Sequence, residues 1–253
     1  MNASTLLDLY HVASKHSQYQ VLPAALQPLL ASDQITVKSR HETARLAYIT
    51  SKLDVTGRSL ADVGGNTGFF SFELLERGAK SVDYFEGNKA HHDFVRAAAH
   101  QLGLGDRLAT FHRYVTFTQN ELAGIDCTLL LNVLHHLGDD FGDPRLNQDA
   151  AKQQILGCLA ALSRQTRTLV FQLGFNWKGD RHQPLFEHGT KAELIDFVKR
   201  GTEDDWTILA IGVAAKDGGT IAFHDLDATN LPRNDALGEF LNRPLFILQS
   251  KHR

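Results

Sequence analysis

The apolar positions of this chain fall into short runs and into longer segments with helical spacing. The short runs predict buried strands at 59–63, 81–85, 107–115, 127–132, 168–173, 206–213 and 244–250. The longer segments predict helices at 69–78, 88–102, 149–162 and 191–200. Strands that alternate with helices predict an α/β fold with a mostly parallel sheet. A further strand at 220–224 is a candidate, and the pattern does not show which of the last strands pair.

The residues before the first predicted strand have a different pattern. Apolar residues from Leu6 to Tyr10 begin a segment expected to be helical to about residue 30, where Pro23 and Pro28 mark its end. Residues 33–48 then predict a turn followed by a helix. We therefore expect a helical cap at 1–50 ahead of one compact domain at 51–253.

A glycine-rich turn follows the first predicted strand. Gly64, Gly65 and Gly68 have no Cβ, so the backbone can turn tightly there and come close to a ligand. A strand, a glycine turn and the start of a helix together predict a cofactor pocket. Asn66 and Phe69 stand where a dinucleotide fingerprint needs its second and third glycines, and no phosphate-loop Gly-Lys-Ser/Thr follows.

The residues Asp62-Val63-Gly64-Gly65-Asn66-Thr67-Gly68 resemble motif I of class I S-adenosylmethionine-dependent methyltransferases, acid-x-Gly-x-Gly-x-Gly, with Asn66 in place of the middle glycine. Asparagine readily adopts the left-handed backbone that such a position uses. The resemblance implies that S-adenosyl-L-methionine is the cofactor, held by Asp62, Gly64, Gly65, Asn66, Gly68 and Phe69. It also implies a Rossmann-like, seven-stranded, mostly parallel sheet of order 3-2-1-4-5-7-6 with helices on both faces. The alternative is a glycine turn that binds nothing.

Three further positions are cofactor candidates. Glu86 ends the second predicted strand, where an acid can accept hydrogen bonds from ribose hydroxyls, as motif II of the family implies. The family's acid after the third strand is missing, and Tyr114 or Thr116 is the candidate for its adenine contact. Lys38 or Arg40, ahead of the first strand, is a candidate for the cofactor carboxylate, with a solvated charge cluster as the alternative.

The residues Asn132-Val133-Leu134-His135-His136-Leu137 resemble motif IV of small-molecule and glycan methyltransferases of this class. The resemblance implies that Asn132 lies near the methionine end of the cofactor. His135 or His136 could deprotonate a hydroxyl acceptor, because an imidazole titrates near neutral pH. The alternative is that one of the two rings only packs in the structure, and we favour His136 for that role. The stretch is not Asp/Asn-Pro-Pro-Tyr, which argues against methylation of an exocyclic base amine.

The loop at 174–190 mixes aromatic and polar residues, as a substrate pocket requires. Trp177 and His182 are its substrate-binding candidates. The alternative is an ordinary surface loop with one packed tryptophan.

Composition narrows the class of partner and the compartment. A formal net charge of -3 provides no global basic field for nucleic acid. The first residues do not resemble a secretory signal, and no apolar run is long enough to span a bilayer. Cys127 and Cys158 in apolar segments are typical of a reducing cytoplasm. No His-x-x-x-His or Cys-x-x-Cys spacing occurs, which argues against a structural metal site.

The resemblance implies an enzyme that transfers a methyl group from S-adenosylmethionine to oxygen of a small molecule or glycan, leaving S-adenosyl-L-homocysteine. Its sequence character is most similar to bacterial polysaccharide-modifying methyltransferases. One alternative is an RNA methyltransferase of the tRNA wobble-uridine type. Another is a non-catalytic module that binds the cofactor and acts through a partner protein. The acceptor and the oligomeric state cannot be predicted from the sequence.

Overall fold

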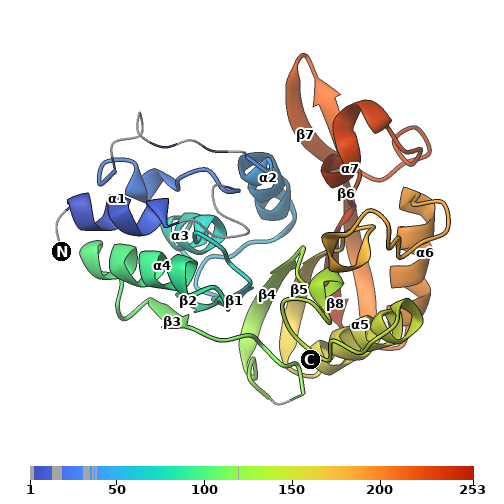
Figure 1. Cartoon of the computed structure of the whole chain (residues 1–253), viewed down its shortest axis with the longest axis horizontal. Coiled ribbons are helices and arrows are strands. Elements are labelled where there is room, and N and C mark those ends of the chain that lie inside the picture. The colour runs from blue at the N-terminus through green and yellow to red at the C-terminus, as the bar shows by residue number, and fades with distance from the viewer. Residues whose placement is uncertain (1–2, 13–18, 31–34, 36, 38, 119) are drawn as a thin grey trace. The chain divides into compact units, whose positions relative to one another are not determined.

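The computed structural model describes residues 3–12, 19–30, 35, 37, 39–118 and 120–253 (Figure 1). The chain divides into two compact units. Unit 1 consists of Met1–Leu46 and Leu53–Val115, and unit 2 of Ala47–Lys52 and Thr116–Arg253. Among the described residues, no helix is both long enough and apolar enough to cross a membrane.

The described residues of unit 1 form three parallel strands in the order β3-β2-β1. These are β1 (Ser59–Val63), β2 (Ser81–Phe85) and β3 (Leu108–Phe111). Helices α3 (Phe69–Glu76) and α4 (Lys89–Gln101) connect them in sequence. The strands predicted at 59–63 and 81–85 are confirmed with the same bounds. The third strand ends at Phe111 instead of 115, because Arg113 N–H turns back to donate to the carbonyl of Phe111 (3.0 Å) and the chain leaves the sheet.

Within unit 1, the N-terminal segment packs on α4 and α3 through two short elements. In α1 (Ala3–His11), Tyr10 is buried with its ring edge-on to Phe94 of α4, at a centroid distance of 5.4 Å. In η1 (Ala24–Leu26), Ala24 N–H donates to Glu73 Oε1 of α3 (2.7 Å). Within residues 3–12 and 19–30, the part of the expected 1–30 helix that the structure describes, helix is found at 3–11 and a 3₁₀ turn at 24–26. The helix expected before the first strand is α2 (Glu42–Lys52).

The described residues of unit 2 form five strands in the order β4-β5-β8-β6-β7. Strands β4 (Ile125–Leu131) and β5 (Thr166–Gln172) are parallel. The other three are antiparallel to their neighbours, namely β6 (Trp206–Asp217), β7 (Thr220–Asp225) and β8 (Leu245–Ser250). The helical elements are η3 (Leu134–His136), α5 (Gln148–Ser163), η4 (Trp177–Gly179), α6 (Lys191–Thr202), η5 (Asp235–Leu237) and α7 (Gly238–Leu241).

The predicted count of seven strands is wrong, since the described residues form eight. The additional strand is β7, the candidate at 220–224, and it pairs with β6 outside the predicted 4-5-7-6 order. Gly218 and Gly219 have φ of 53° and 99°, so they close the two-residue turn of a hairpin. That turn extends β6 to Asp217, beyond its expected end at 213.

The strands of unit 2 contribute fully buried apolar residues to its core. Leu129, Leu130, Val170, Ile247 and Leu248 are buried at 0–1 % exposure, as expected for strands covered on both faces. Strand β4 is followed directly by the polar residue Asn132, and β5 ends in the polar residue Gln172. The candidate site residues of unit 2 follow these two strand ends, namely Asn132 and the histidine pair after β4 and the 174–190 loop after β5.

Candidate functional site

The turn after β1 has the backbone that its sequence predicts. Gly64, Asn66 and Gly68 have φ of 69°, 54° and 81°, so all three are left-handed. Asn66 is therefore a working substitute for the middle glycine of the motif. Its side-chain Oδ1 accepts from Thr67 N–H (2.8 Å), which stabilises the turn locally.

Gly65 is required by packing inside the protein. A Cβ at this position would lie 2.5 Å from Cε2 of Tyr84 and 2.8 Å from Oδ2 of Asp62. The Tyr84 ring is fully buried, and its hydroxyl donates to the carbonyl of Asn66. The Tyr84 side chain of β2 therefore packs directly against the glycine turn. Only glycine fits at position 65, because any Cβ there would overlap the Tyr84 ring.

Asp62 at the end of β1 faces the interior. Its Oδ2 accepts from the Ser71 hydroxyl in the first turn of α3 (2.7 Å). Burial raises the pKa of Asp62 to about 6, while hydrogen bonds from Ser71 and the charge of Arg45 act in the opposite direction. The motif I acid therefore ties the strand to the helix that follows it.

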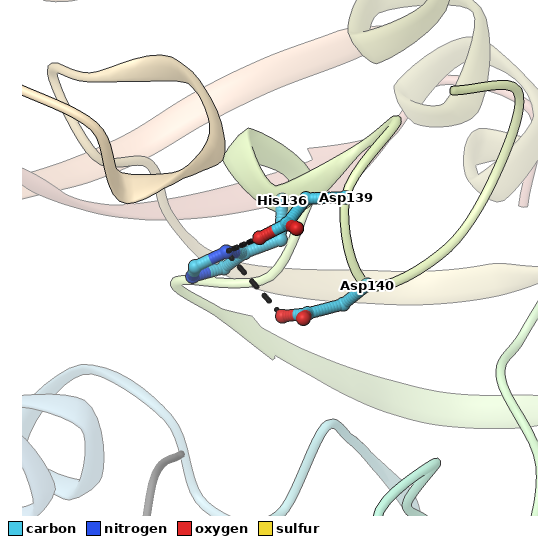
Figure 2. Close-up of side chains that lie close together, drawn as sticks. All are labelled: His136, Asp139 and Asp140. Carbon is cyan, nitrogen blue, oxygen red and sulfur yellow. Dashed lines mark ion pairs between the residues drawn. The ribbon is translucent and has the colours of Figure 1, made fainter. Parts of the chain in front are cut away.

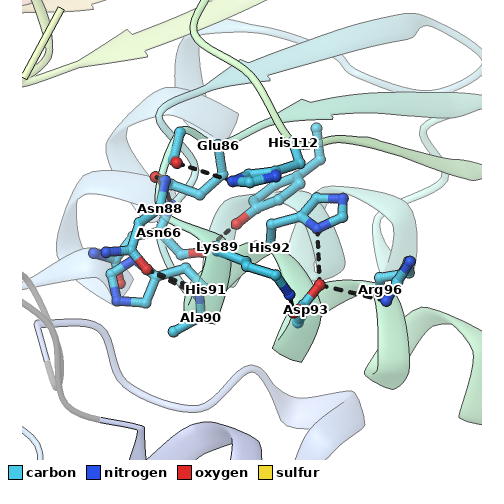
Figure 3. A network of polar contacts seen from close by, with 12 residues as sticks. Asn66, Glu86, Asn88, Lys89, Ala90, His91, His92, Asp93, Arg96 and His112 are labelled. Atoms are coloured by element: carbon cyan, nitrogen blue, oxygen red, sulfur yellow. Dashed lines mark hydrogen bonds and ion pairs between the residues drawn. The ribbon is translucent and has the colours of Figure 1, made fainter.

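Glu86 connects the glycine turn after β1 with the loop between β2 and α4 (Figure 3). Its Oε2 accepts from Asn66 N–H of the glycine turn (2.9 Å), and its Oε1 accepts from Asn88 N–H (2.8 Å). Asn88 in turn caps α4, because its Oδ1 accepts from Ala90 N–H and His91 N–H (3.0 and 3.2 Å). The acid predicted from motif II is thus held beside the motif I turn.

Tyr114 lies against the same loop. A Cβ at Gly87 would fall 2.1 Å from Cζ of Tyr114, so the aromatic ring covers the backbone directly after Glu86. The Tyr114 side chain is 46 % exposed. Thr116, the other adenine candidate, donates to Glu121 through its hydroxyl (3.0 Å). The contacts of Tyr114 place it next to a predicted cofactor residue.

The sequence did not indicate Gln20. This buried residue accepts at Oε1 from Thr67 Oγ1 and from Phe69 N–H at the start of α3, both at 3.1 Å. Phe69 itself is buried. A lone glutamine in a segment without a motif carries no signal in a single sequence. Lys38 lies outside the described residues, and the guanidinium of Arg40 lies 4.6 Å from the centre of the Tyr19 ring.

Asn132 begins a polar network in unit 2. It follows β4 with φ of 62°, and its Oδ1 accepts from Arg243 Nη1 (2.8 Å) while its Nδ2 donates to Gln172 Oε1 (2.9 Å). Gln172 Nε2 donates to the carbonyl of Arg243 (2.9 Å), and Glu239 accepts from both Nε and Nη2 of Arg243 (3.0 and 2.6 Å). Because a guanidinium can only donate, these contacts define the orientation of both amides. The sequence indicated Asn132 but not the other three residues of this network.

The two histidines of motif IV have different surroundings. His135 is 2 % exposed, and its Nδ1 accepts from Gly174 N–H (3.3 Å). The His136 side chain is 16 % exposed, and its Nδ1 lies 3.4 Å from Asp140 Oδ2 and 3.9 Å from Asp139 Oδ2. His135 is therefore the more deeply packed ring, and which of the two histidines acts as the base stays a prediction.

The two substrate-binding candidates of the 174–190 loop also differ in burial. Trp177 is 4 % exposed, and its Nε1 donates to the carbonyl of Leu137 (2.6 Å), so it fastens η4 to the segment after η3. His182 is exposed, and its backbone N–H donates to Asp180 (2.9 Å). Their roles in substrate binding stay predictions.

No family model matches this sequence, and no curated protein matches it. Solved methyltransferase structures, however, superpose on nearly the whole chain. The chain therefore has the fold of class I S-adenosylmethionine-dependent methyltransferases, as the two sequence motifs predicted.

One of these structures is the bifunctional kinase-methyltransferase WbdD, with a TM-score of 0.64 at 14 % identity over 98 % of this chain and 47 % of the WbdD chain. This chain thus spans about half the length of WbdD. PH1948 from Pyrococcus horikoshii, proposed to be an RNA methyltransferase, matches over 99 % of both chains at 12 % identity. Its TM-score of 0.49 is too low to bear on function.

Proposed function

We propose that this protein is an S-adenosylmethionine-dependent methyltransferase that methylates a hydroxyl group of a small molecule or glycan. The observation that carries the proposal is the position of the Glu86 carboxylate. It follows β2, where the family resemblance implies the ribose-binding acid, and it accepts from both the glycine turn and the start of α4.

The residues of unit 1 match the chemistry of this cofactor. A carboxylate offers about four acceptor positions, so Glu86 can accept from ribose hydroxyls in addition to two amides. Gly64 and Gly68, left-handed and without Cβ, allow a ligand close to the backbone. The exposed ring of Tyr114 offers an apolar face for adenine. When bound, the cofactor supplies an electrophilic methyl group on a sulfonium.

Unit 2 contains Asn132, which the family resemblance implies for the methionine end of the cofactor, and the candidates for binding the acceptor. The network around Asn132 holds one amide in a single orientation at the end of β4. Fixed polar groups align an acceptor, and alignment can supply several kcal/mol of a displacement barrier. The absence of Asp/Asn-Pro-Pro-Tyr after β4 and the net charge of -3 support a hydroxyl acceptor over a nucleic-acid base.

The test is transfer of a labelled methyl group from S-adenosylmethionine to a panel of sugars, phosphorylated sugars, phenols and total tRNA. We expect transfer to a hydroxyl compound, reduced at least tenfold in Glu86→Ala when the cofactor is below saturation. Glu76→Ala is the matched control, since Glu76 is an exposed acid at the end of α3, and it should keep full activity.

Two results would replace the proposal by its alternatives. Transfer only to tRNA, falling steeply with salt, would assign an RNA methyltransferase. Tight binding of S-adenosylhomocysteine without transfer to any acceptor would assign a non-catalytic module.

A further inference from the structure

Three side chains with metal-binding atoms converge at the end of η3 and in the turn that follows it. The chain folds back on itself there, since Asp139 N–H and Asp140 N–H both donate to the carbonyl of His136 (3.0 and 3.2 Å). This turn brings residues at positions i, i+3 and i+4 to the same side. Figure 2 shows the imidazole of His136 and the carboxylates of Asp139 and Asp140 pointing toward one another.

The distances fit one bound cation. His136 Nδ1 lies 3.4 Å from Asp140 Oδ2 and 3.9 Å from Asp139 Oδ2, and the three donor atoms lie within 4.8 Å of one another. Metal bonds of about 2.1 Å keep neighbouring donors roughly 3–3.5 Å apart. A metal ion would therefore need only a small inward movement of the two aspartate side chains.

The imidazole is held in the orientation that such a site needs. Its ring packs on the buried ring of His135 at a centroid distance of 4.3 Å, with an interplanar angle of 40°. On another side, a Cβ at Gly179 would lie 3.3 Å from Cε1 of His136. The Nδ1 atom itself has no contact with solvent and faces the carboxylates. Neighbours that fix a ligand ring before the metal arrives are a common feature of metal sites.

The charges favour a divalent ion. Two carboxylates and a neutral imidazole carry a charge of about -2, which a divalent cation neutralises. The side chains are only partly accessible, at 16 % for His136, 26 % for Asp140 and 36 % for Asp139, so the two negative charges are incompletely solvated. A protonated imidazole would neutralise only one of the two charges.

We propose that His136, Asp139 and Asp140 form a site for a divalent first-row transition metal ion. One nitrogen and two carboxylate oxygens suit Mn²⁺, Co²⁺ or Zn²⁺, whereas Mg²⁺ prefers ligands that are all oxygen. Three protein ligands leave positions for water or for a hydroxyl of the acceptor. A bound ion lowers the pKa of a hydroxyl that it coordinates. That second role rests on the proposed function, while metal binding itself does not.

The experiment is calorimetric titration of the metal-free full chain with Mn²⁺, Zn²⁺ and Mg²⁺, without cofactor. We expect one equivalent of Mn²⁺ or Zn²⁺ to bind, and Mg²⁺ to bind at least tenfold more weakly. Asp139→Asn and Asp140→Asn should each weaken Mn²⁺ binding at least tenfold. The matched control is Asp143→Asn, because Asp143 lies in the same loop but pairs with Arg145 (2.8 Å), and it should bind like the wild type.

Circular dichroism and urea unfolding establish that each variant folds. Bound Co²⁺ gives a second measurement, since its visible absorption should require His136 and disappear in His136→Ala. Absence of saturable Mn²⁺ and Zn²⁺ binding, or equal binding in Asp139→Asn and Asp143→Asn, would overturn the metal site and leave an imidazole–carboxylate pair. If metal binds but S-adenosylhomocysteine does not, the metal site stands and the proposed methyl transfer fails.

Discussion

At the scale of single residues, the glycine turn depends on side chains that face the protein interior. Tyr84 leaves no room for a Cβ at Gly65, and Asp62 fixes the first turn of α3 through Ser71. Asp62 is therefore a buried carboxyl group whose hydrogen bonds come from the hydroxyl and the backbone of Ser71. Such a group ties stability to pH, because its charged form is penalised by burial.

Because its pKa is raised in the folded protein, we expect Asp62 to lower the free energy of unfolding as the pH rises. Its pKa is about 6 in the folded protein and ordinarily 3.8, so the unfolded chain loses this proton first. The contribution of Asp62 to the free energy of unfolding should fall between about pH 4 and pH 6, by roughly 2–3 kcal/mol, and then stay level. Asp62→Asn should remove this part of the pH dependence, as measured by urea unfolding at pH 4, 5, 6 and 7.

The exposed acid Asp54 is a control, because its contribution to stability should change with pH in the opposite direction to that of Asp62. Asp54 accepts from Thr56 N–H (2.9 Å), which lowers its pKa, so its contribution to stability is lost as the pH falls. Asp54→Asn should therefore destabilise the protein at neutral pH and have little effect at low pH. If Asp62→Asn leaves the slope between pH 4 and pH 6 unchanged, Asp62 is not the buried acid described above.

At the scale of elements, the residue that caps α4 also lies next to the proposed cofactor-binding acid, so its substitution should affect both stability and cofactor binding. Asn88 caps α4 and follows the loop that holds Glu86, whereas Asn147 caps α5 through one bond to Ala150 N–H (2.8 Å). The two caps are the same residue type in the same role, but only one lies beside the proposed cofactor residues. This pair separates a general loss of stability from a local effect on binding.

Replacing either cap by alanine should lower the free energy of unfolding by about 1 kcal/mol. Asn88→Ala should also weaken binding of S-adenosylhomocysteine several-fold, because the loop that positions Glu86 loses its anchor. Asn147→Ala should leave that affinity unchanged. Urea unfolding and calorimetric titration measure the two effects, and equal affinities for both variants would contradict the role given to the α4 cap.

The network between β4, β5 and the segment before β8 makes a second prediction. Arg243 is 12 % exposed in its side chain and holds both Asn132 and Glu239. Arg243→Met leaves their oxygens without this donor and should cost about 1–3 kcal/mol of stability. Arg200→Met breaks an exposed pair with Asp196 and should cost less than about 0.5 kcal/mol. Similar urea midpoints for the two variants would show that the network contributes little.

At the scale of the whole molecule, what the sequence predicts well is what depends on local pattern. Strands at 59–63 and 81–85 have apolar runs ending in glycine or an acid, and the structure has them at those bounds. The hairpin of β6 and β7 has a Gly-Gly turn that the sequence contains, but the order β8-β6-β7 depends on pairing between distant segments. No periodicity within one segment carries that information.

The same limit applies to the candidate site. Asn132, Glu86 and the glycine turn follow strands directly, so their places could be predicted from motif and strand end. Gln20 reaches the glycine turn within unit 1, and Arg243 and Glu239 reach Asn132 within unit 2. Each comes from a segment far away in sequence, and a single chain shows nothing that marks them. The environments of His135 and His136 differ because of Gly174 and the turn to Asp140, which are tertiary contacts.

The central claim is that unit 1 binds S-adenosylmethionine through Glu86, and calorimetric titration with S-adenosylhomocysteine tests it most directly. NAD and ATP serve as comparison ligands, and Glu76→Ala is the control variant. We predict micromolar binding of S-adenosylhomocysteine alone, weakened about 10- to 100-fold by Glu86→Ala, the effect of losing hydrogen bonds to a charged acceptor. Absence of binding, preference for NAD, or equal affinity in wild type and Glu86→Ala would contradict the claim.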